Sequence, residues 1–359
     1  MAYQLKRILK KSTPPIYTTN FGNEVDLPSV TVCIPARNEQ HALTECLEKV
    51  IASDYDRLEI IVLDDVSGDD TSALIKSFAS EGVRFVKGSP LTNGWLGKNH
   101  ALQGLLNEAS GSYILFMDVD TRLSPKAISN MVRFTVSNRS AMLSVLPRRE
   151  DGWRASVVFS PLRYFWELIF SRRLWPATAS SAWLIRREIL EKRFNGFDSF
   201  KDAIQPETKI ASELAQTNEY RFLVGNESLG VGYEKKWSSQ LTTSIRLMFP
   251  LLYMKPLLCA SVIIDLLLLL VPFIVLGAAV YGFSISVPLF VATITLVVGY
   301  ISLYGLYTHH AWKKGWLLGA LLWPIIIIQE LVLVLVSVIQ YRRRTIKWKG
   351  RLIQPEARN

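Results

Sequence analysis

Two aspartates separated by one residue, Asp118 and Asp120, close the apolar run SYILFMDVD (112–120). Such a run is typical of a β-strand whose end emerges from the core. Residues i and i+2 of a strand share a face, so we expect both carboxylates near one point. Close carboxylates repel each other unless a cation lies between them, and hard oxygen ligands suit Mg²⁺ or Mn²⁺. The pattern therefore predicts a divalent-metal site at this pair.

A second polar cluster follows another apolar run, SVTVCIPA (29–36). Its members are Pro35, Ala36, Asn38 and Glu39, which stand where the predicted strand ends. Backbone groups and short side chains at this place could hold a ribose or a base edge. The alternative is a plain loop in which Asn38 or Glu39 supports the N-terminus of the next helix.

A third cluster closes the run LEIIVLDD (58–65). Asp64 or Asp65 could accept a hydrogen bond from a base N–H group. Ser67 and Asp69, which follow, suit a turn and a helix cap.

Lys98 comes directly after the segment GWLG (94–97) and starts a predicted helix over 98–109. The N-terminus of a helix carries partial positive charge, and an ammonium group adds a full one. The combination predicts an anion site that suits a diphosphate.

These clusters depend on strands that alternate with amphipathic helices from residue 29 to about residue 130. We expect a further strand at 83–88 and helices at 41–53, 70–80 and 98–109. The alternation predicts an α/β fold with a parallel sheet and helices on both faces. Ligands of such sheets bind beyond the carboxyl ends of the strands, which is where the polar clusters fall.

The order IPARNE, LDD-S-x-DD-T, GWLGKNHAL, FMDVD resembles glycosyltransferase family 2 over residues 29–230. The resemblance implies the GT-A fold, a nucleotide-sugar donor with a UDP-sugar favoured, and Mg²⁺ or Mn²⁺. It also implies roles for the clusters. Pro35, Ala36, Glu39 and Asp64 would contact the nucleoside, Lys98 would approach the diphosphate, Asp120 would ligate the metal, and Asp118 would assist the metal or contact the donor. From their places in the same clusters, we also expect Asn38 and Asp65 to bind substrate.

The resemblance also implies an acidic Glu-Asp pair at a helix start 80–90 residues after the DxD sequence. This chain has Pro206-Glu207 there, within IQPETKIASELA (204–215). Proline suits the first helical turn, and Glu207 would take the position of the catalytic base. The alternatives are that Glu207 only complements the helix dipole, or that an anionic acceptor needs no base.

Three apolar segments follow residue 250, at 257–281, 287–307 and 316–340. Each is long enough to span a bilayer, but the third contains Pro324 and Glu330 near its middle. We expect two transmembrane helices and a re-entrant hairpin broken near Pro324, with an ordinary third span as the alternative. In the hairpin, Glu330 would face protein or water rather than lipid.

The net charge of +10 lies at the two ends of the chain. Residues 1–12 carry four basic residues and no acid, and residues 342–359 carry seven basic residues and one acid. Because the body is neutral, the charge argues against a nucleic-acid-binding face and favours contact with an anionic lipid surface. Lys313 and Lys314 indicate that the second membrane loop is cytoplasmic, like the catalytic half.

The sequence thus predicts four regions. These are a basic arm at 1–28, a catalytic domain at 29–240 with interfacial helices near 153–175, a membrane domain at 241–341, and a basic cytoplasmic tail at 342–359. In the arm, Leu5, Ile8 and Leu9 would share one helical face. The arm has no apolar stretch typical of a secretory signal. Cys33, Cys46 and Cys259 lack metal or disulfide spacing, so we expect reduced structural thiols.

We expect an inverting, metal-dependent transfer of a single sugar to a membrane lipid at the plasma membrane. The spans and the WKGR sequence (348–351) resemble the family branch that glycosylates hopanoids and carotenoids. The Q-x-x-R-W sequence of processive synthases is absent before the spans, because Trp237, Gln240 and Arg246 stand in another order. The alternatives are a polyprenyl-phosphate glycosyltransferase and a non-catalytic membrane scaffold or nucleotide sensor.

Overall fold

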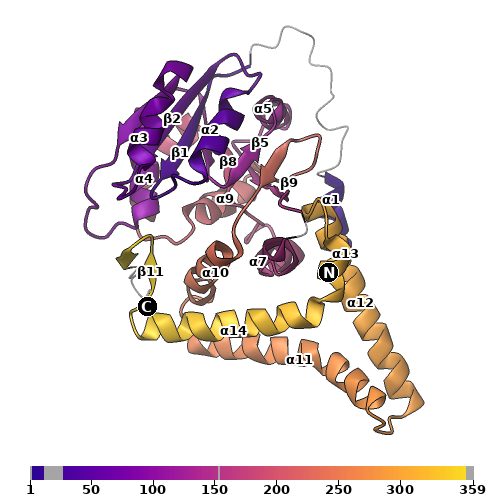
Figure 1. Ribbon diagram of the computed structural model, residues 1–359. Coiled ribbons are helices and arrows are strands. Elements are labelled where there is room, and N and C mark those ends of the chain that lie inside the picture. The colour runs from indigo at the N-terminus through magenta and orange to yellow at the C-terminus, as the bar shows by residue number, and fades with distance from the viewer. Residues whose placement is uncertain (1, 12–26, 153, 353–359) are drawn as a thin grey trace. The chain divides into compact units, whose positions relative to one another are not determined.

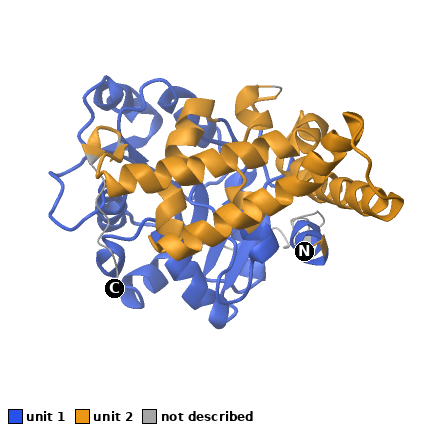
Figure 2. Cartoon of the chain, turned by 90° about the horizontal axis from the view of Figure 1, so that it is seen from below, with its two compact units in different colours: residues 1, 3–149, 167–234 blue, residues 2, 150–166, 235–359 orange. Residues whose placement is uncertain are grey.

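The computed structural model describes residues 2–11, 27–152 and 154–352 and divides into two compact units (Figure 2). The first unit consists mainly of residues 3–149 and 167–234. The second consists mainly of residues 150–166 and 235–359. The basic arm beyond residue 11, with Pro14 and Pro15, and the tail beyond residue 352 lie outside the described residues.

The first unit is built on a seven-stranded sheet in the order β3-β2-β1-β4-β8-β6-β9 (Figure 1). Strand β8 is antiparallel to both of its neighbours, and every other pairing in the sheet is parallel. This confirms the mostly parallel sheet expected of the GT-A fold, whereas the alternation alone predicted a parallel sheet and gave no sign of antiparallel β8. The strands are β1 (Val30–Ala36), β2 (Leu58–Asp64), β3 (Val83–Lys87), β4 (Tyr113–Met117), β6 (Met142–Leu146), β8 (Ala182–Arg186) and β9 (Tyr220–Val224).

Helices cover both faces of this sheet because alternate strand residues point in opposite directions. Val32 of β1 belongs to a core cluster on one face of the sheet. Its neighbour Cys33 belongs to a second core cluster on the opposite face. The first face is covered by α2 (Leu43–Ile51) and α5 (Ala127–Ser137), and the second by α4 (Gly97–Glu108) and α9 (Pro206–Gln216). The remaining helices of this unit are α1 (Ala2–Lys11), α3 (Thr71–Ser77) and α8 (Arg187–Lys192), with short 3₁₀ turns at Ala79–Glu81 and Asp198–Phe200.

A small second sheet follows the carboxyl end of β4. It has the order β5-β10-β7, in which β10 (Val231–Tyr233) pairs with both β5 (Thr121–Leu123) and β7 (Arg148–Arg149). The sequence pattern gave no signal for it, because strands of two or three residues are too short to have a recognisable period.

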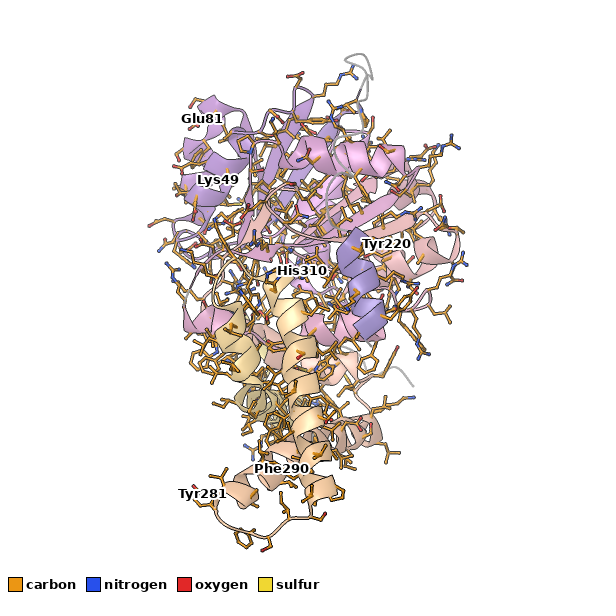
Figure 3. The ribbon with its side chains drawn as sticks, turned by 90° about the vertical axis from the view of Figure 1, so that its right-hand side faces the viewer. Lys49, Glu81, Tyr220, Tyr281, Phe290 and His310 are labelled. Carbon is orange, nitrogen blue, oxygen red and sulfur yellow. The ribbon has the colours of Figure 1, made fainter. Side chains whose placement is uncertain are left out.

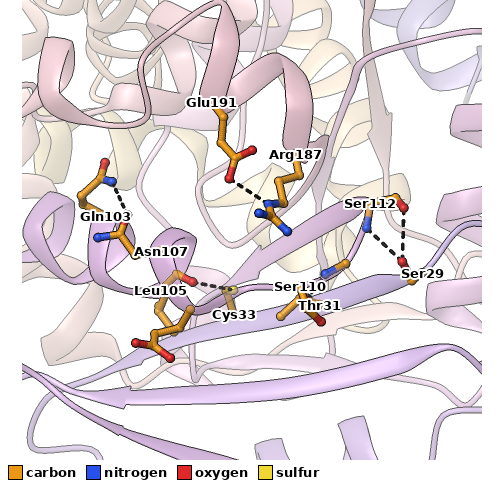
Figure 4. Close-up of polar contacts among 12 residues, drawn as sticks. Ser29, Thr31, Cys33, Gln103, Leu105, Asn107, Ser110, Ser112, Arg187 and Glu191 are labelled. Atoms are coloured by element: carbon orange, nitrogen blue, oxygen red, sulfur yellow. Dashed lines mark hydrogen bonds and ion pairs between the residues drawn. The ribbon is translucent and has the colours of Figure 1, made fainter.

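Polar side chains join β1 to its neighbours at their amino ends (Figure 4). The Ser112 N–H donates to Ser29 Oγ at 3.0 Å, and the Thr31 hydroxyl donates to the Glu59 carboxylate at 2.6 Å. Partial burial acts to raise the pKa of Glu59, but hydrogen bonds from Thr31 and Ser110 outweigh it and hold the pKa below its usual value.

The cysteines are free and buried, as expected of structural thiols. Cys33 Sγ lies 3.9 Å from the carbonyl oxygen of Leu105 (Figure 4), and burial raises the pKa of Cys46 to about 12. A thiol with so high a pKa carries almost no thiolate near neutral pH and is therefore inert.

The second unit consists of helices and a terminal hairpin. Three of its helices are long and apolar enough to cross a membrane, judged by length and composition: α11 (Pro256–Val280), α12 (Val287–Ala311) and α14 (Trp323–Arg342). Tyr281 and Phe290 flank the short connection between α11 and α12, and both are exposed (Figure 3). The unit also contains α6 (Ala155–Val158), α10 (Trp237–Leu251), α13 (Trp316–Leu321), β11 (Lys347–Trp348) and β12 (Arg351–Leu352).

The third apolar segment is broken near Pro324, as expected, but the part after the break is one continuous helix of 20 residues, long enough to span a membrane, and not a hairpin turn. Helix α13 ends at Leu321, and α14 begins at Trp323 with Pro324 in its first turn. Proline ends the preceding helix because it lacks an N–H group and clashes with the preceding turn. Glu330 lies within α14 rather than in a turn, and its side chain is buried against protein, which is one of the two surroundings expected for it.

The aromatic- and arginine-rich stretch near 153–175 forms two short helices, α6 and α7 (Arg163–Phe170). Pro161 lies in the turn between them. Residues 150–166 of this stretch belong to the second unit, although they interrupt the sequence of the first.

Buried side chains bind the backbone of that turn. Gln240 of α10 donates to the Ser156 carbonyl at 2.7 Å and accepts from the Ser160 hydroxyl at 3.1 Å. Glu330 accepts from the Leu162 N–H at 3.3 Å. A turn of this kind cannot satisfy its own backbone groups, so the side chains do it.

We expect Gln240→Ala to destabilise the protein by about 2 kcal/mol, because the Ser156 carbonyl would stay buried without its donor. The melting midpoint in detergent should fall by about 3 °C. The matched control is Gln216→Ala, at an exposed glutamine, which should change stability by less than about 0.5 kcal/mol. Equal midpoints for the two variants would contradict this role of Gln240.

Candidate functional site

Hydrogen bonds join the loops that follow β1 and β2. Asn38 Oδ1 accepts from the Gly68 N–H at 2.8 Å, and the Asn38 N–H donates to Ser67 Oγ at 2.9 Å. The Glu39 N–H donates to Thr71 Oγ1 at 2.9 Å. The two clusters predicted to bind the nucleoside are therefore joined by hydrogen bonds. Asn38 and Glu39 take part in these bonds and so help to hold the two loops together.

The other predicted members of these clusters lie at the paired strand ends. Pro35 pairs with Leu63 and Ala36 with Asp64 across β1 and β2. Pro35 is half-buried, whereas Ala36, Asp64 and Asp65 are buried. We therefore expect a ligand at this edge of the sheet to contact the backbone of these residues and the parts of their side chains that are not buried.

Asp64 is held by hydroxyl groups of its own loop. Its Oδ1 accepts from the Ser67 N–H at 3.1 Å and from the Ser67 hydroxyl, and its Oδ2 accepts from the Ser72 hydroxyl. An ionised carboxylate has about four lone-pair positions, so Asp64 can accept one further bond from a ligand.

Asp69 holds the start of α3. Partial burial opposes its ionisation, but hydrogen bonds from the Thr71 hydroxyl and N–H outweigh that effect and hold the pKa of Asp69 below its usual value. The helix start is thus fixed by an ionised side chain, as its spacing suggested.

Val66 adopts a backbone conformation that is unusual for its type, with a φ of 55°. A β-branched residue in this left-handed region is strained. Its side chain is 50% exposed, and the Arg37 guanidinium donates to its carbonyl oxygen at 2.8 Å. The loop therefore presents an apolar side chain beside Asp64 and Asp65.

Asp118 and Asp120 lie in a turn between β4 and β5, and this corrects the strand expected over 112–120. Strand β4 ends at Met117, and the Thr121 N–H donates to the Asp118 carbonyl at 3.0 Å. The chain must turn here because Thr121 starts a strand of the second sheet. The shared-face argument for the two carboxylates does not apply in a turn.

Lys98 contacts Asp118 directly. Its Nζ lies 2.7 Å from Asp118 Oδ1, and both side chains are partly buried. Because Lys98 is in the first turn of α4, the pair joins the N-terminus of that helix to the turn after β4.

Asp120 lies near α2. The pKa of Cys46 in that helix, raised mainly by burial, is raised further by the charges of Asp120 and Glu39. Arg122 fixes the same turn, since it donates to the Val119 carbonyl at 2.8 Å and lies 2.9 Å from the Glu45 carboxylate of α2.

Asn99, next to Lys98, is buried and holds the loop that leads into α9. Its side-chain amide donates to the carbonyl oxygens of Phe200 and Ala203, both at 2.7 Å. The Leu96 N–H donates to Lys201 in the same loop at 2.8 Å. The amide therefore connects the start of α4 to the start of α9.

Helix α9 begins at Pro206, as predicted, and Glu207 in its first turn is only 2% exposed. The hydroxyl groups of Thr178 and Thr208 lie 2.8 Å apart, and this contact ties the helix to the segment before β8. Burial raises the pKa of Tyr220, and the charges of Glu167 and Glu207 raise it further. Both carboxylates therefore lie in the surroundings of Tyr220.

The donor set at the turn suits a hard divalent cation. Mg²⁺ commonly takes one or two protein carboxylates and completes its shell with phosphate oxygens and water. Asp120 and Asp118 could supply those carboxylates. Among the described residues, no group of three or more His, Cys, Asp or Glu side chains could hold a metal alone.

Sequence reasoning missed the residues that support the site. Asn99 and Arg122 had no assigned role, because their partners are distant in sequence. Asn99 lies inside the GWLGKNHAL motif, so the motif signalled its importance but not its function.

Comparison with known proteins finds a family match over part of the chain. Residues 31–194 match the family described as Glycosyl transferase family 2. A mannosyltransferase of Pyrobaculum calidifontis, solved with GDP-Man and Mn²⁺, has a similar fold. The TM-score is 0.56 at 19% identity, over 94% of this chain and 92% of that one.

Two curated relatives resemble a shorter part of the chain. An undecaprenyl-phosphate 4-deoxy-4-formamido-L-arabinose transferase of Aeromonas hydrophila is 29% identical over 36% of this chain and 41% of its own length. A 4,4'-diaponeurosporenoate glycosyltransferase of Staphylococcus aureus is 30% identical over 36% of this chain and 33% of its own length. The chain thus spans well under half the length of these relatives.

We expect Asn99→Ala to destabilise the protein by about 2 to 3 kcal/mol, since two buried carbonyl groups would lose their donor. The matched control is Asn107→Ala, at an exposed position of the same helix. Thermal melting in detergent measures both variants. A melting midpoint for Asn99→Ala as high as that of the control would refute the proposed connection.

Proposed function

We propose, from the match of residues 31–194 to the family described as Glycosyl transferase family 2, that the chain is a glycosyltransferase. It moves a single sugar from a nucleotide-sugar donor to a membrane lipid, with inversion at the anomeric carbon. The observation that carries this proposal is the contact between Lys98 and Asp118, next to Asp120, at the carboxyl edge of the sheet. Ligands of parallel sheets bind at this edge.

The nucleoside would bind at the joined loops after β1 and β2. Pro35, Ala36, Asn38 and Glu39 form one side of this proposed site, and Asp64 and Asp65 form the other. Asp64 would accept a base N–H, which uses its remaining lone pair. A UDP-sugar is the donor that the proposal favours.

The diphosphate would lie against the N-terminus of α4, where Lys98 offsets negative charge as the sugar leaves. On this view Lys98 exchanges part of its contact with Asp118 for phosphate oxygens. Asp120 would hold Mg²⁺ or Mn²⁺, with Asp118 assisting. The cation would supply further charge neutralisation for the leaving diphosphate.

Glu207 would act as the base. The acceptor hydroxyl attacks the anomeric carbon and forms the new C–O bond, its proton passes to the Glu207 carboxylate, and the bond to the diphosphate breaks. The nucleoside diphosphate leaves with the electron pair of that bond. The place of Glu207 in the first turn of α9, where the family resemblance implies the catalytic base, supports this role.

The acceptor would be a lipid, because three helices of the chain are long and apolar enough to cross a membrane. We place the enzyme in the plasma membrane with its catalytic unit in the cytoplasm. Lys313 and Lys314 after α12, and the basic residues that follow α14, support that orientation through their attraction to the cytoplasmic leaflet.

A polyprenyl phosphate is the second candidate acceptor. The name of the Aeromonas relative contains undecaprenyl phosphate, and Glu207 stands where the family resemblance implies an aspartate. A phosphate oxygen is already anionic and attacks without a base. The two candidate acceptors therefore differ in their need for Glu207.

We expect Asp120→Asn to reduce sugar transfer by about a hundredfold or more, because half of the proposed cation-binding charge is lost. Membranes that contain the full chain would be incubated with radiolabelled nucleotide-sugar, and the labelled lipid would be counted. The control is the exposed Asp56→Asn. Unchanged labelling would refute the metal role, and nucleotide binding without any labelled lipid in the parent protein would favour a sensor.

We expect Glu207→Gln to reduce transfer to a hydroxyl acceptor by about a hundredfold or more, because the amide cannot accept the proton. Transfer to a polyprenyl phosphate would stay nearly unchanged. The control is the exposed Glu213→Gln of the same helix. The transfer rate of Glu207→Gln is divided by that of Glu213→Gln for each acceptor. A low ratio indicates an acceptor hydroxyl that needs the base, and a ratio near one indicates a polyprenyl phosphate.

A further inference from the structure

The first unit exposes three large apolar side chains on one short segment. Phe170, Leu174 and Trp175 are 58%, 57% and 61% exposed. Soluble proteins seldom leave such side chains adjacent on the surface without a binding purpose.

This segment is firmly held, so its exposure is not the result of fraying. The Ser212 hydroxyl donates to the Leu174 carbonyl at 2.6 Å, and the Arg173 guanidinium donates to the Gln216 carbonyl at 2.7 Å. The backbone groups of Arg172 and Trp175 also bond to each other, at 3.0 and 3.1 Å. The structure thus presents the apolar side chains on a fixed backbone.

Helix α1 lies beside this segment, because the Gln4 side-chain amide donates to the Ser171 carbonyl. Leu5 and Leu9 are buried and Ile8 is half-buried, which confirms the apolar face predicted for this helix. The opposite face exposes Tyr3, Lys6, Arg7 and Lys10. The sequence has no acidic residue before Glu24.

We propose that α1 and residues 170–175 together form a patch that docks the first unit on an anionic lipid surface. Trp and Tyr rings favour the headgroup region of a bilayer, and Lys and Arg side chains are attracted to anionic lipids. Leu174 and Phe170 supply the apolar area that enters the boundary with the acyl chains.

Two features favour a lipid surface over a protein partner. The exposed charges of the patch are all basic, which matches the negative cytoplasmic leaflet. The same chain carries candidate membrane spans, so covalent linkage keeps a bilayer at high effective concentration near this unit. The inference concerns where the unit docks and does not depend on which sugar or acceptor it uses.

The experiment labels Leu174→Cys with the fluorophore NBD in the full chain, which leaves Trp175 in place. The native cysteines are buried and should not react. The protein is reconstituted in nanodiscs of phosphatidylcholine that contain about one third phosphatidylglycerol. Lipids with a nitroxide near the headgroup then quench NBD that reaches the interface. The matched control is Ala52→Cys, at an exposed position of the same unit.

We expect quenching at position 174 to exceed that at position 52 by about threefold or more. Adding Lys6→Glu and Lys10→Glu should lower the quenching at 174 to about half, whereas Lys49→Glu with Lys126→Glu should leave it unchanged. Equal quenching at 174 and 52 would overturn the proposal. Protection of the 174 label from water without lipid quenching would also overturn it, in favour of a protein partner.

Discussion

The loops that follow the carboxyl ends of the parallel strands have backbone N–H and C=O groups with no neighbouring strand to bond. The rest of this site depends on which groups form hydrogen bonds with them. Here side chains from distant segments bond to them. Asn38 bonds to the loop after β2, and Asn99 bonds to the loop before α9. The start of α4, which carries Lys98, and the loop that leads into α9, which carries Glu207, are fixed by the same few hydrogen bonds. These contacts make the edge a rigid site rather than a set of independent loops.

The ion pair between Lys98 and Asp118 has a different character. Both side chains are partly exposed, so the pair contributes little to stability, on the order of 1 kcal/mol or less. A weak pair at this place is useful because a ligand with negative charge can replace it at little energetic expense. Buried Asn99 gives rigidity, whereas Lys98 beside it keeps the freedom to change partners.

The sequence predicted the sheet, the helices on both faces and the break before Pro324, because apolar periodicity and proline chemistry are local signals. It also predicted that Glu330 would face protein or water rather than lipid, and the side chain is buried in protein. It did not predict that β4 ends at Met117, because the turn is imposed by the short β5-β10-β7 sheet, whose strands come from three distant places. For the same reason Asn99 and Arg122 were missed. Their bonds to residues near 200 and to Glu45 depend on the tertiary fold.

Residues 150–166 belong to the second unit although they interrupt the sequence of the first, and this limits where the chain can be cut into fragments. Their partners are in the second unit: Phe165 packs on Tyr304 and Trp323, and Ser156 bonds to Gln240. A chain cut after residue 234 would keep these residues but lose the helices that cover them. The first unit therefore cannot be separated from the helices after residue 234 by one cut without leaving an apolar internal segment uncovered, and such a fragment would tend to aggregate.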